Sequence, residues 1–180
     1  MNAIPFVKDV AFEYGRPDRL SPLIRRVICN NPGPFTFTGS GTYIVGPDEG
    51  PLAVIDPGPD DPAHLSALVQ AIGRARVSHV VITHTHKDHC GGARAFAGRV
   101  GAPIAGAGPH PVSRGKEGVP AFEEGADLAY TPDEILKDGA RLSGGPWAIE
   151  TVATPGHLSN HLCFALLEEA TLFTGDHIMG

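Results

Sequence analysis

The chain of 180 residues has few cysteines, few aromatic residues and no long apolar run. Its three cysteines, Cys29, Cys90 and Cys163, are an odd number at wide spacing, which excludes a disulfide framework. No stretch approaches the ~18 apolar residues of a membrane span. The first fifteen residues contain Lys8 and Asp9 and no apolar core, so they do not form a secretory signal. We therefore expect a cytoplasmic protein without a membrane partner.

Basic charge is also scarce, with 14 basic against 20 acidic residues and a formal net charge of −6. No global field would therefore attract nucleic acid or an anionic membrane surface. In contrast, the chain has 23 glycines and 17 prolines, and turn residues at this density exclude long helical bundles and coiled coils. Because 42% of the residues are apolar, a chain of this length can bury a core, and we expect one domain over residues 1–180.

Short apolar runs between turn residues predict an α/β layer in the first half of the chain. Strands are predicted at residues 35–46, 52–56 and 77–83. Asp61 followed by Pro62 predicts the start of a helix. The buried face of that helix is marked by Leu65, Leu68, Val69 and Ile72. A strand, a helix and a strand in succession form a βαβ-type unit, which is typical of an α/β layer.

The second half of the chain predicts a further sheet. The first layer is completed by a helix predicted from Gly92 through Phe96 and a strand predicted at residues 101–105. Residues 106–135 have little periodicity, which predicts a loop with short helical pieces. Further strands are predicted at residues 147–153, 161–166 and 171–174. Strands that follow an α/β half indicate that a second sheet begins here.

The segment that carries chemistry is His84-Thr85-His86-Lys87-Asp88-His89. Three imidazoles and a carboxylate lie within six residues, directly after a buried strand that delivers them at its carboxyl end. Imidazole and carboxylate donors suit borderline metals such as zinc or iron. In an extended turn, His84 and His86 can point to one metal, while Asp88 and His89 in the next turn can face a second.

This His-x-His-x-Asp-His pattern resembles the signature of the metallo-β-lactamase superfamily. Further segments are similar to family motifs in the same order: Gly41–Val45 and Ile55–Gly58 to the opening strands, Thr154–His157 to the third-histidine motif, and Thr174–Asp176 to the bridging-aspartate motif. The resemblance covers nearly all of residues 35–180. The stretch from Tyr130 to Gly180 is most similar to the mitochondrial β-lactamase-like endoribonuclease branch and its bacterial relatives, and a glyoxalase II-like identity is equally compatible with the ligands.

The resemblance implies a ligand set for two metal ions. His84, His86 and His157 would hold the first, Asp88 and His89 the second, and Asp176 would bridge both. The expected cofactor is Zn²⁺, two ions per chain, with iron or manganese as alternatives. A metal-bound hydroxide would attack the substrate, and Asp88 would orient that nucleophile or accept its proton.

Other residues near the motifs are not expected to be ligands. His161 and His177 fall outside the ligand positions and are interpreted as supporting or surface groups. Asp56 is interpreted as a structural residue beside the metal loop.

The resemblance also implies an αββα sandwich whose second half is incomplete here. Members of the family carry one more histidine well beyond the bridging aspartate, whereas this chain ends at Gly180, soon after Asp176. We expect that the C-terminal part of the domain is missing, as in a truncated longer protein. A natural short form, completed by another subunit or carrying one metal, is the alternative. Either way, the last strands should expose apolar surface.

The function implied is that of a metal-dependent hydrolase acting on an ester, thioester, lactam or phosphodiester. Its substrate would be a small molecule or single-stranded RNA, and the net charge of −6 weighs weakly against RNA. A mononuclear iron sulfur dioxygenase-like enzyme is one alternative, and an inactive truncated fragment is another. A flavodiiron protein is disfavoured, because that group places Glu where this chain has His86. A homo-oligomer is compatible with the sequence.

Overall fold

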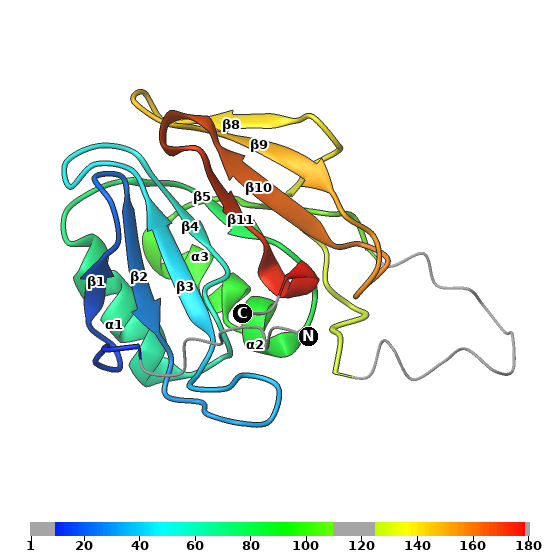
Figure 1. Cartoon of the computed structure of the whole chain (residues 1–180), viewed down its shortest axis with the longest axis horizontal. Coiled ribbons are helices and arrows are strands. Elements are labelled where there is room, and N and C mark those ends of the chain that lie inside the picture. Colours follow the sequence, from blue (N-terminus) through cyan, green and yellow to red (C-terminus); the bar gives the residue numbers. More distant parts are fainter. Residues whose placement is uncertain (1–9, 110–124, 179–180) are drawn as a thin grey trace, which may run out of the picture.

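The computed structural model describes residues 10–109 and 125–178, and they form two sheets with helices on one side (Figure 1). The larger sheet has seven strands in sequence order. They are β1 (Pro17–Arg19), β2 (Ile24–Ile28), β3 (Gly41–Val45), β4 (Leu52–Ile55), β5 (Val77–Ile82), β6 (Ile104–Gly106) and β7 (Glu134–Ile135). Strands β1 to β4 pair antiparallel, and β4 to β7 pair parallel.

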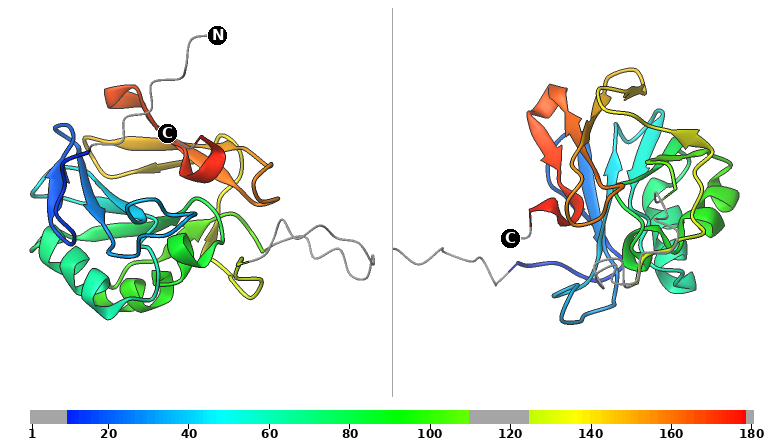
Figure 2. Two further views of the ribbon diagram at one scale, coloured as in Figure 1. Left: turned by 60° about the horizontal axis from the view of Figure 1, so that its bottom comes forward. Right: turned by 90° about the vertical axis from the view of Figure 1, so that its right-hand side faces the viewer.

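The smaller sheet has four antiparallel strands in the order β11-β10-β9-β8. Its strands are β8 (Arg141–Ser143), β9 (Ala148–Ala153), β10 (Leu162–Leu166) and β11 (Thr171–Phe173). The helical segments are α1 (Pro62–Ile72), α2 (Lys87–Cys90), α3 (Ala93–Val100) and the 3₁₀ turns η2 (Leu167–Glu169) and η3 (Gly175–His177). Figure 2 shows α1 and α3 on one face of the larger sheet and the smaller sheet on the other.

Two apolar cores hold these layers together. One lies between the larger sheet and the helices and includes Val54, Leu65 and Phe96. The other lies between the two sheets and includes Ile55 and Trp147. Neighbouring residues of β4 face opposite cores, because successive side chains of a strand point to opposite faces. This strand is therefore buried on both faces, which explains its unbroken apolar run.

The predicted βαβ unit is confirmed as β4, α1 and β5. Asp61 caps the helix, since its Oδ1 accepts hydrogen bonds from the backbone N–H groups of Ala63 (2.8 Å) and His64 (3.2 Å). The predicted apolar face is buried except for Val69, which is exposed. The helix ends at Gly73, whose φ of 61° favours glycine.

Several expected elements differ from the observed ones. Residues 35–40 are not part of a strand, because this segment turns back on itself: the backbone N–H of Thr36 donates to Gly33 O at 3.2 Å and that of Gly39 to Thr36 O at 2.8 Å. Only Gly41–Val45 pairs in the sheet. Strands β1, β2, β7 and β8 were not predicted. Part of the expected 106–135 loop, residues 110–124, lies outside the described residues, and residues 125–133 form turns without the expected helical pieces.

The described residues form a helix–sheet–sheet arrangement, which is the α/β fold with two sheets expected for this family. Within residues 10–109 and 125–178, nothing covers the outer face of the smaller sheet, where Val152 and Leu172 are exposed as expected. All three cysteines are buried and unpaired. In the same described residues, no helix is long and apolar enough to cross a membrane.

Candidate metal site

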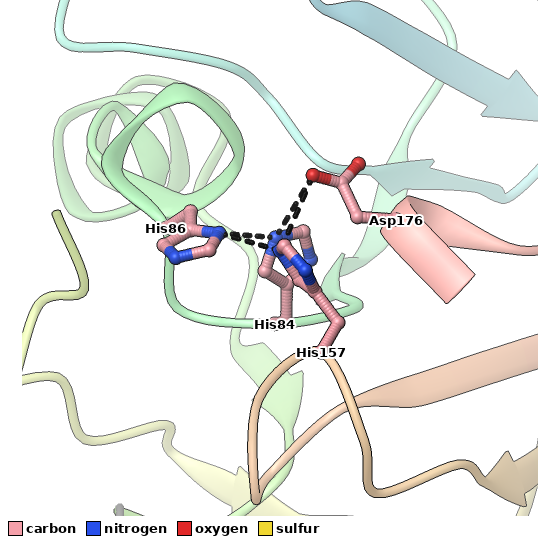
Figure 3. A group of neighbouring side chains, drawn as sticks. All are labelled: His84, His86, His157 and Asp176. Atoms are coloured by element: carbon pink, nitrogen blue, oxygen red, sulfur yellow. Dashed lines mark hydrogen bonds and ion pairs between the residues drawn. The ribbon is translucent and has the colours of Figure 1, made fainter. Parts of the chain in front are cut away.

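Strand ends and loops from both sheets bring the predicted ligands together at one edge of the molecule. His84 and His86 follow β5, and α2 begins directly after them. His157 lies in the loop between β9 and β10, and Asp176 lies in η3 after β11. Figure 3 shows these four side chains converging on a common point. The site therefore exists only when the two sheets are docked.

The four converging side chains have donor atoms within 4.8 Å of one another. The Nδ1 of His86 lies 3.1 Å from the Nε2 of His84 and 2.9 Å from the Nε2 of His157. Asp176 Oδ2 lies 3.7 Å and 3.4 Å from those two Nε2 atoms. Atoms that bind one tetrahedral zinc ion at 2.0–2.1 Å lie about 3.3 Å apart. This four-donor half, His84, His86, His157 and Asp176, thus fits a single metal ion.

Two more predicted ligands lie beside the four-donor half. His89 Nε2 lies 3.3 Å from Asp176 Oδ1, the second oxygen of that carboxylate, and 3.5 Å from Asp88 Oδ2. Asp176 therefore presents one oxygen to each group, as a bridging carboxylate would. We call Asp88, His89 and Asp176 the three-donor half of the site.

A buried carboxylate, Asp56, orients histidines of both halves. Its Oδ2 accepts a hydrogen bond from the Thr83 hydroxyl at 2.6 Å. Because that hydroxyl donates to Asp56, it accepts from Nδ1–H of His84, 3.0 Å away. Nδ1 of His89 lies 2.9 Å from Asp56 Oδ2 and donates to it. His84 thus carries its proton on Nδ1 and turns an Nε2 lone pair toward the site, and His89 would do the same once a metal displaces the proton on its Nε2.

Asp56 itself is held in an uncommon backbone conformation, with a φ of 51°. Its carbonyl accepts a hydrogen bond from Thr42 Oγ1 at 2.7 Å, and Thr42 Oγ1 lies 3.0 Å from Nε2 of the buried His64. The left-handed region is tolerated by aspartate at modest cost. Strain at the end of β4 therefore aims this carboxylate at the residues that follow β5.

His161 and Gly175 position Asp176. The backbone N–H of Asp176 donates to Nε2 of His161 at 3.2 Å, and Nδ1 of His161 contacts Thr154 Oγ1 at 2.8 Å. Gly175 has a φ of 48°, and a Cβ there would lie 2.8 Å from both His161 Nε2 and Thr83 Oγ1. Only glycine can therefore bring η3 this close to the loop after β5.

The electrostatics of the site favour a cation. Burial and the neighbouring imidazoles of His89 and His161 hold the pKa of His84 far below its usual range, so this ring is neutral and can act as a ligand. Burial alone would also lower the pKa of His89, but its hydrogen bonds to Asp176 and Asp56 raise it to about 10. The carboxylates around His89 thus stabilise a positive charge at this place.

All six predicted ligand residues, His84, His86, Asp88, His89, His157 and Asp176, lie in this one group. His161 is not one of the four converging donors, and the side chain of His177 is exposed. Sequence reasoning missed the role of Ser40, whose hydroxyl donates to Asp88 Oδ2 at 3.2 Å. The only feature of the sequence that points to Ser40 is its position directly before the Gly41–Val45 segment.

The comparisons with known proteins agree with the fold. Residues 36–179 match the sequence model of the metallo-beta-lactamase superfamily. The match covers most of the chain, and the chain belongs to this superfamily.

Among curated proteins, the chain is 35% identical over 168 residues to an atrochrysone carboxyl ACP thioesterase from Cryptosporiopsis, covering 91% of this chain and 46% of the relative. It is 34% identical over 172 residues to the beta-lactamase-like protein 2 homolog of Caenorhabditis elegans, covering 91% and 52%. The chain thus spans about half the length of these relatives. Among solved structures, a beta-lactamase domain protein from Burkholderia ambifaria has a TM-score of 0.69 at 19% identity, covering 95% of this chain and 57% of that one.

Proposed function

We propose that this chain carries the metal site of a hydrolase that cleaves thioesters of small molecules. The observation that carries the proposal is the four-donor half, in which three imidazoles and a carboxylate meet within 4.8 Å. The relative that is named as an ACP thioesterase supports the choice of a thioester over the other acyl and phosphoryl substrates.

The chain's own residues would hold the metal and handle the proton. The four-donor half would hold one ion and the three-donor half a second, and Zn²⁺ suits both donor sets. A divalent cation in such a site supplies a water of lowered pKa and polarises a carbonyl. Asp88, whose side chain is partly exposed and oriented by Ser40, would orient the attacking water and accept its proton. Attack on the carbonyl carbon breaks the C–S bond and yields a carboxylic acid and a thiol.

An aromatic loop near Asp88 supports a substrate with an apolar acyl group. Phe35 and Phe37 have exposed fractions of 93% and 63%. Their loop is tied to the site, because Ser40 contacts Asp88 and its backbone N–H donates to Asn31 Oδ1 at 2.9 Å. Two exposed phenylalanines on an anchored loop would contact an acyl chain more favourably than a phosphodiester backbone.

The metal content of the purified protein is the first test. We expect two zinc ions per chain by inductively coupled plasma mass spectrometry, and loss of both after dialysis against a chelator. One iron per chain, with oxygen consumed when a persulfide is added, would contradict the proposal and favour the sulfur dioxygenase alternative.

A substrate panel on the zinc-loaded protein is the second test. We expect thiol release from an acyl thioester, detected with a thiol reagent, and little turnover of a β-lactam or single-stranded RNA. Asp176→Asn should abolish this release, whereas His177→Gln, a change at the exposed neighbouring residue, should leave it unchanged. Cleavage of RNA but not of thioesters by the zinc-loaded protein would overturn the thioester proposal.

A further inference from the structure

The loop between β2 and β3 reaches the metal site through the side chain of Ser40. This residue is 8% exposed, and its hydroxyl lies 3.2 Å from Asp88 Oδ2. Its carbonyl oxygen accepts a hydrogen bond from the backbone N–H of Cys29 at 2.9 Å. The loop can close this tightly because residue 39 is glycine, since a Cβ there would lie 2.0 Å from the carbonyl oxygen of Cys29. The backbone of Ser40 is therefore fixed where its hydroxyl meets Asp88.

Asn31, at the other end of this loop, binds Ser40 with both polar atoms of its side-chain amide. The backbone N–H of Ser40 donates to Asn31 Oδ1 at 2.9 Å, and Nδ2 of Asn31 lies 3.1 Å from Ser40 Oγ. The first contact fixes the orientation of the amide, because a backbone N–H can only donate and must face the amide oxygen. The nitrogen of the amide therefore faces Ser40 Oγ, and it does so as a donor.

The direction of the Ser40 hydroxyl proton follows from these contacts. Because Ser40 Oγ already accepts from Asn31 Nδ2, it is free to donate its own proton to Asp88 Oδ2. The same Oδ2 lies 3.5 Å from Nε2 of His89. A ligating carboxylate that is itself hydrogen-bonded is oriented toward its metal ion. Asn31 thus acts on Asp88 through Ser40, without touching it.

Asn31 also shapes the loop, and this second role can be separated from the first. Its backbone carbonyl accepts from Thr36 Oγ1 at 2.6 Å, which any residue at this position would allow. Its Oδ1 accepts from the backbone N–H of Ser40, which an aspartate would also do. The substitution Asn31→Asp therefore preserves the hydrogen bonds that close the loop and removes only the donor to Ser40 Oγ.

We propose that Asn31 is a positioning residue, which sets the orientation of Asp88 through the Ser40 hydroxyl and thereby strengthens metal binding in the three-donor half. This inference rests on the metal site of the proposed function, but not on the choice of a thioester as the substrate. Metal binding is therefore the quantity to measure, and the result is informative whether or not the protein releases a thiol.

The test is a calorimetric titration of the metal-free protein with zinc, in which Ser40→Ala and Asn31→Asp are compared with the original protein. Loss of a group that orients a metal ligand weakens metal binding by about 10- to 100-fold. We expect both variants to weaken the second binding step by about tenfold and to leave the first unchanged. In Asn31→Asp, the new carboxylate would accept the Ser40 hydroxyl proton, which then no longer reaches Asp88.

Two matched controls account for the added charge and for the lost hydroxyl. Asn30→Asp introduces the same charge at the exposed residue next to Asn31. Ser66→Ala removes an exposed hydroxyl on α1, where it donates to the carbonyl oxygen of Pro62. Both control variants should bind two zinc ions as the original protein does.

The inference is overturned if Ser40→Ala or Asn31→Asp binds the second ion as tightly as the original protein does. It is also overturned if both binding steps weaken equally, because that result would indicate a general loss of structure. If the original protein has no second binding step, the two-ion site of the proposed function is refuted, and this inference with it. Two normal steps in the original protein and in both variants would refute only the role of Asn31.

Discussion

The two halves of the metal site differ in the number of donors and in how these are held. The four-donor half offers one atom from each of His84, His86, His157 and Asp176, which is a complete tetrahedral set. The three-donor half has Asp88 and His89 and shares Asp176. An ion in the first half can therefore be held by this chain alone, whereas an ion in the second must take a further ligand from water or substrate. We expect the first half to bind metal more tightly.

The largest effect should come from a change within the four-donor half. His84→Ala removes a buried donor at the centre of this group. The three remaining side chains and a water molecule would hold a tetrahedral ion much more weakly than the four side chains do. We expect metal affinity in this half to fall by about a thousandfold or more. Calorimetric titration of the metal-free protein with zinc measures this. Unchanged metal content in the variant would refute the ligand assignment.

A change in the three-donor half should affect one ion only. Asp88→Asn removes one of the carboxylate charges beside His89 while preserving its shape, so we expect the bound zinc to fall from two ions to one per chain. Mass spectrometry of the metal content gives the stoichiometry. Lys87→Gln, at the exposed adjacent residue, serves as the matched control. Loss of both ions in Asp88→Asn would show that the halves do not bind independently.

Asp56→Asn should weaken both halves together, by about 10- to 100-fold in metal affinity. The side-chain amide of asparagine would place an N–H donor opposite the Thr83 hydroxyl and the Nδ1–H of His89, which are donors themselves. The hydrogen bonds that fix the tautomers of His84 and His89 would therefore be lost. The same zinc titration measures this effect. A loss confined to one of the two binding steps would contradict the shared orientation by Asp56.

The smallest expected effect concerns His64, whose ring contacts Thr42, the residue that donates to the Asp56 carbonyl. Burial lowers the pKa of His64 below its usual 6.5. As the pH falls through about 6.5, the unfolded chain therefore gains a proton that the folded chain does not, and stability decreases. His64→Gln should reduce this acid loss, by about 1 kcal/mol or less between pH 7 and 5. Urea unfolding of the metal-free protein at several pH values measures it, and an unchanged pH dependence would contradict the expectation.

The sequence predicted the site better than it predicted the sheet around it. Five of the six ligand residues lie in the short motifs around His84–His89 and His157, and the sixth, Asp176, follows a recognisable strand. They were assigned through the resemblance of these short motifs to the superfamily, which did not require the sheet to be predicted. In contrast, β2 contains Arg25 and Arg26 in succession, which interrupts any apolar pattern. Arg25 is buried where α1 ends beside it, and Arg26 is half-buried and pairs with Asp18 at 3.3 Å. Such long-range partners are not visible in a local pattern.

The orienting network behind the ligands was equally hidden from the sequence. Asp56 follows one strand, Thr83 follows another, and His161 directly precedes β10 of the smaller sheet, so their hydrogen bonds depend on tertiary packing. Gly175 was part of a recognised motif, yet the need for glycine there comes from Thr83 and His161, which only the folded structure brings near.

The position of Asp176 on the last described turn has a consequence for the whole chain. A metal ion shared between His84 and Asp176 would be a cross-link between the two sheets, and it would close a long loop of the unfolded chain. A covalent cross-link over a loop of that size restricts the unfolded state by on the order of 4 kcal/mol. In a protein whose three cysteines are all unpaired, the metal would thus be the counterpart of a disulfide, and one that a chelator can open.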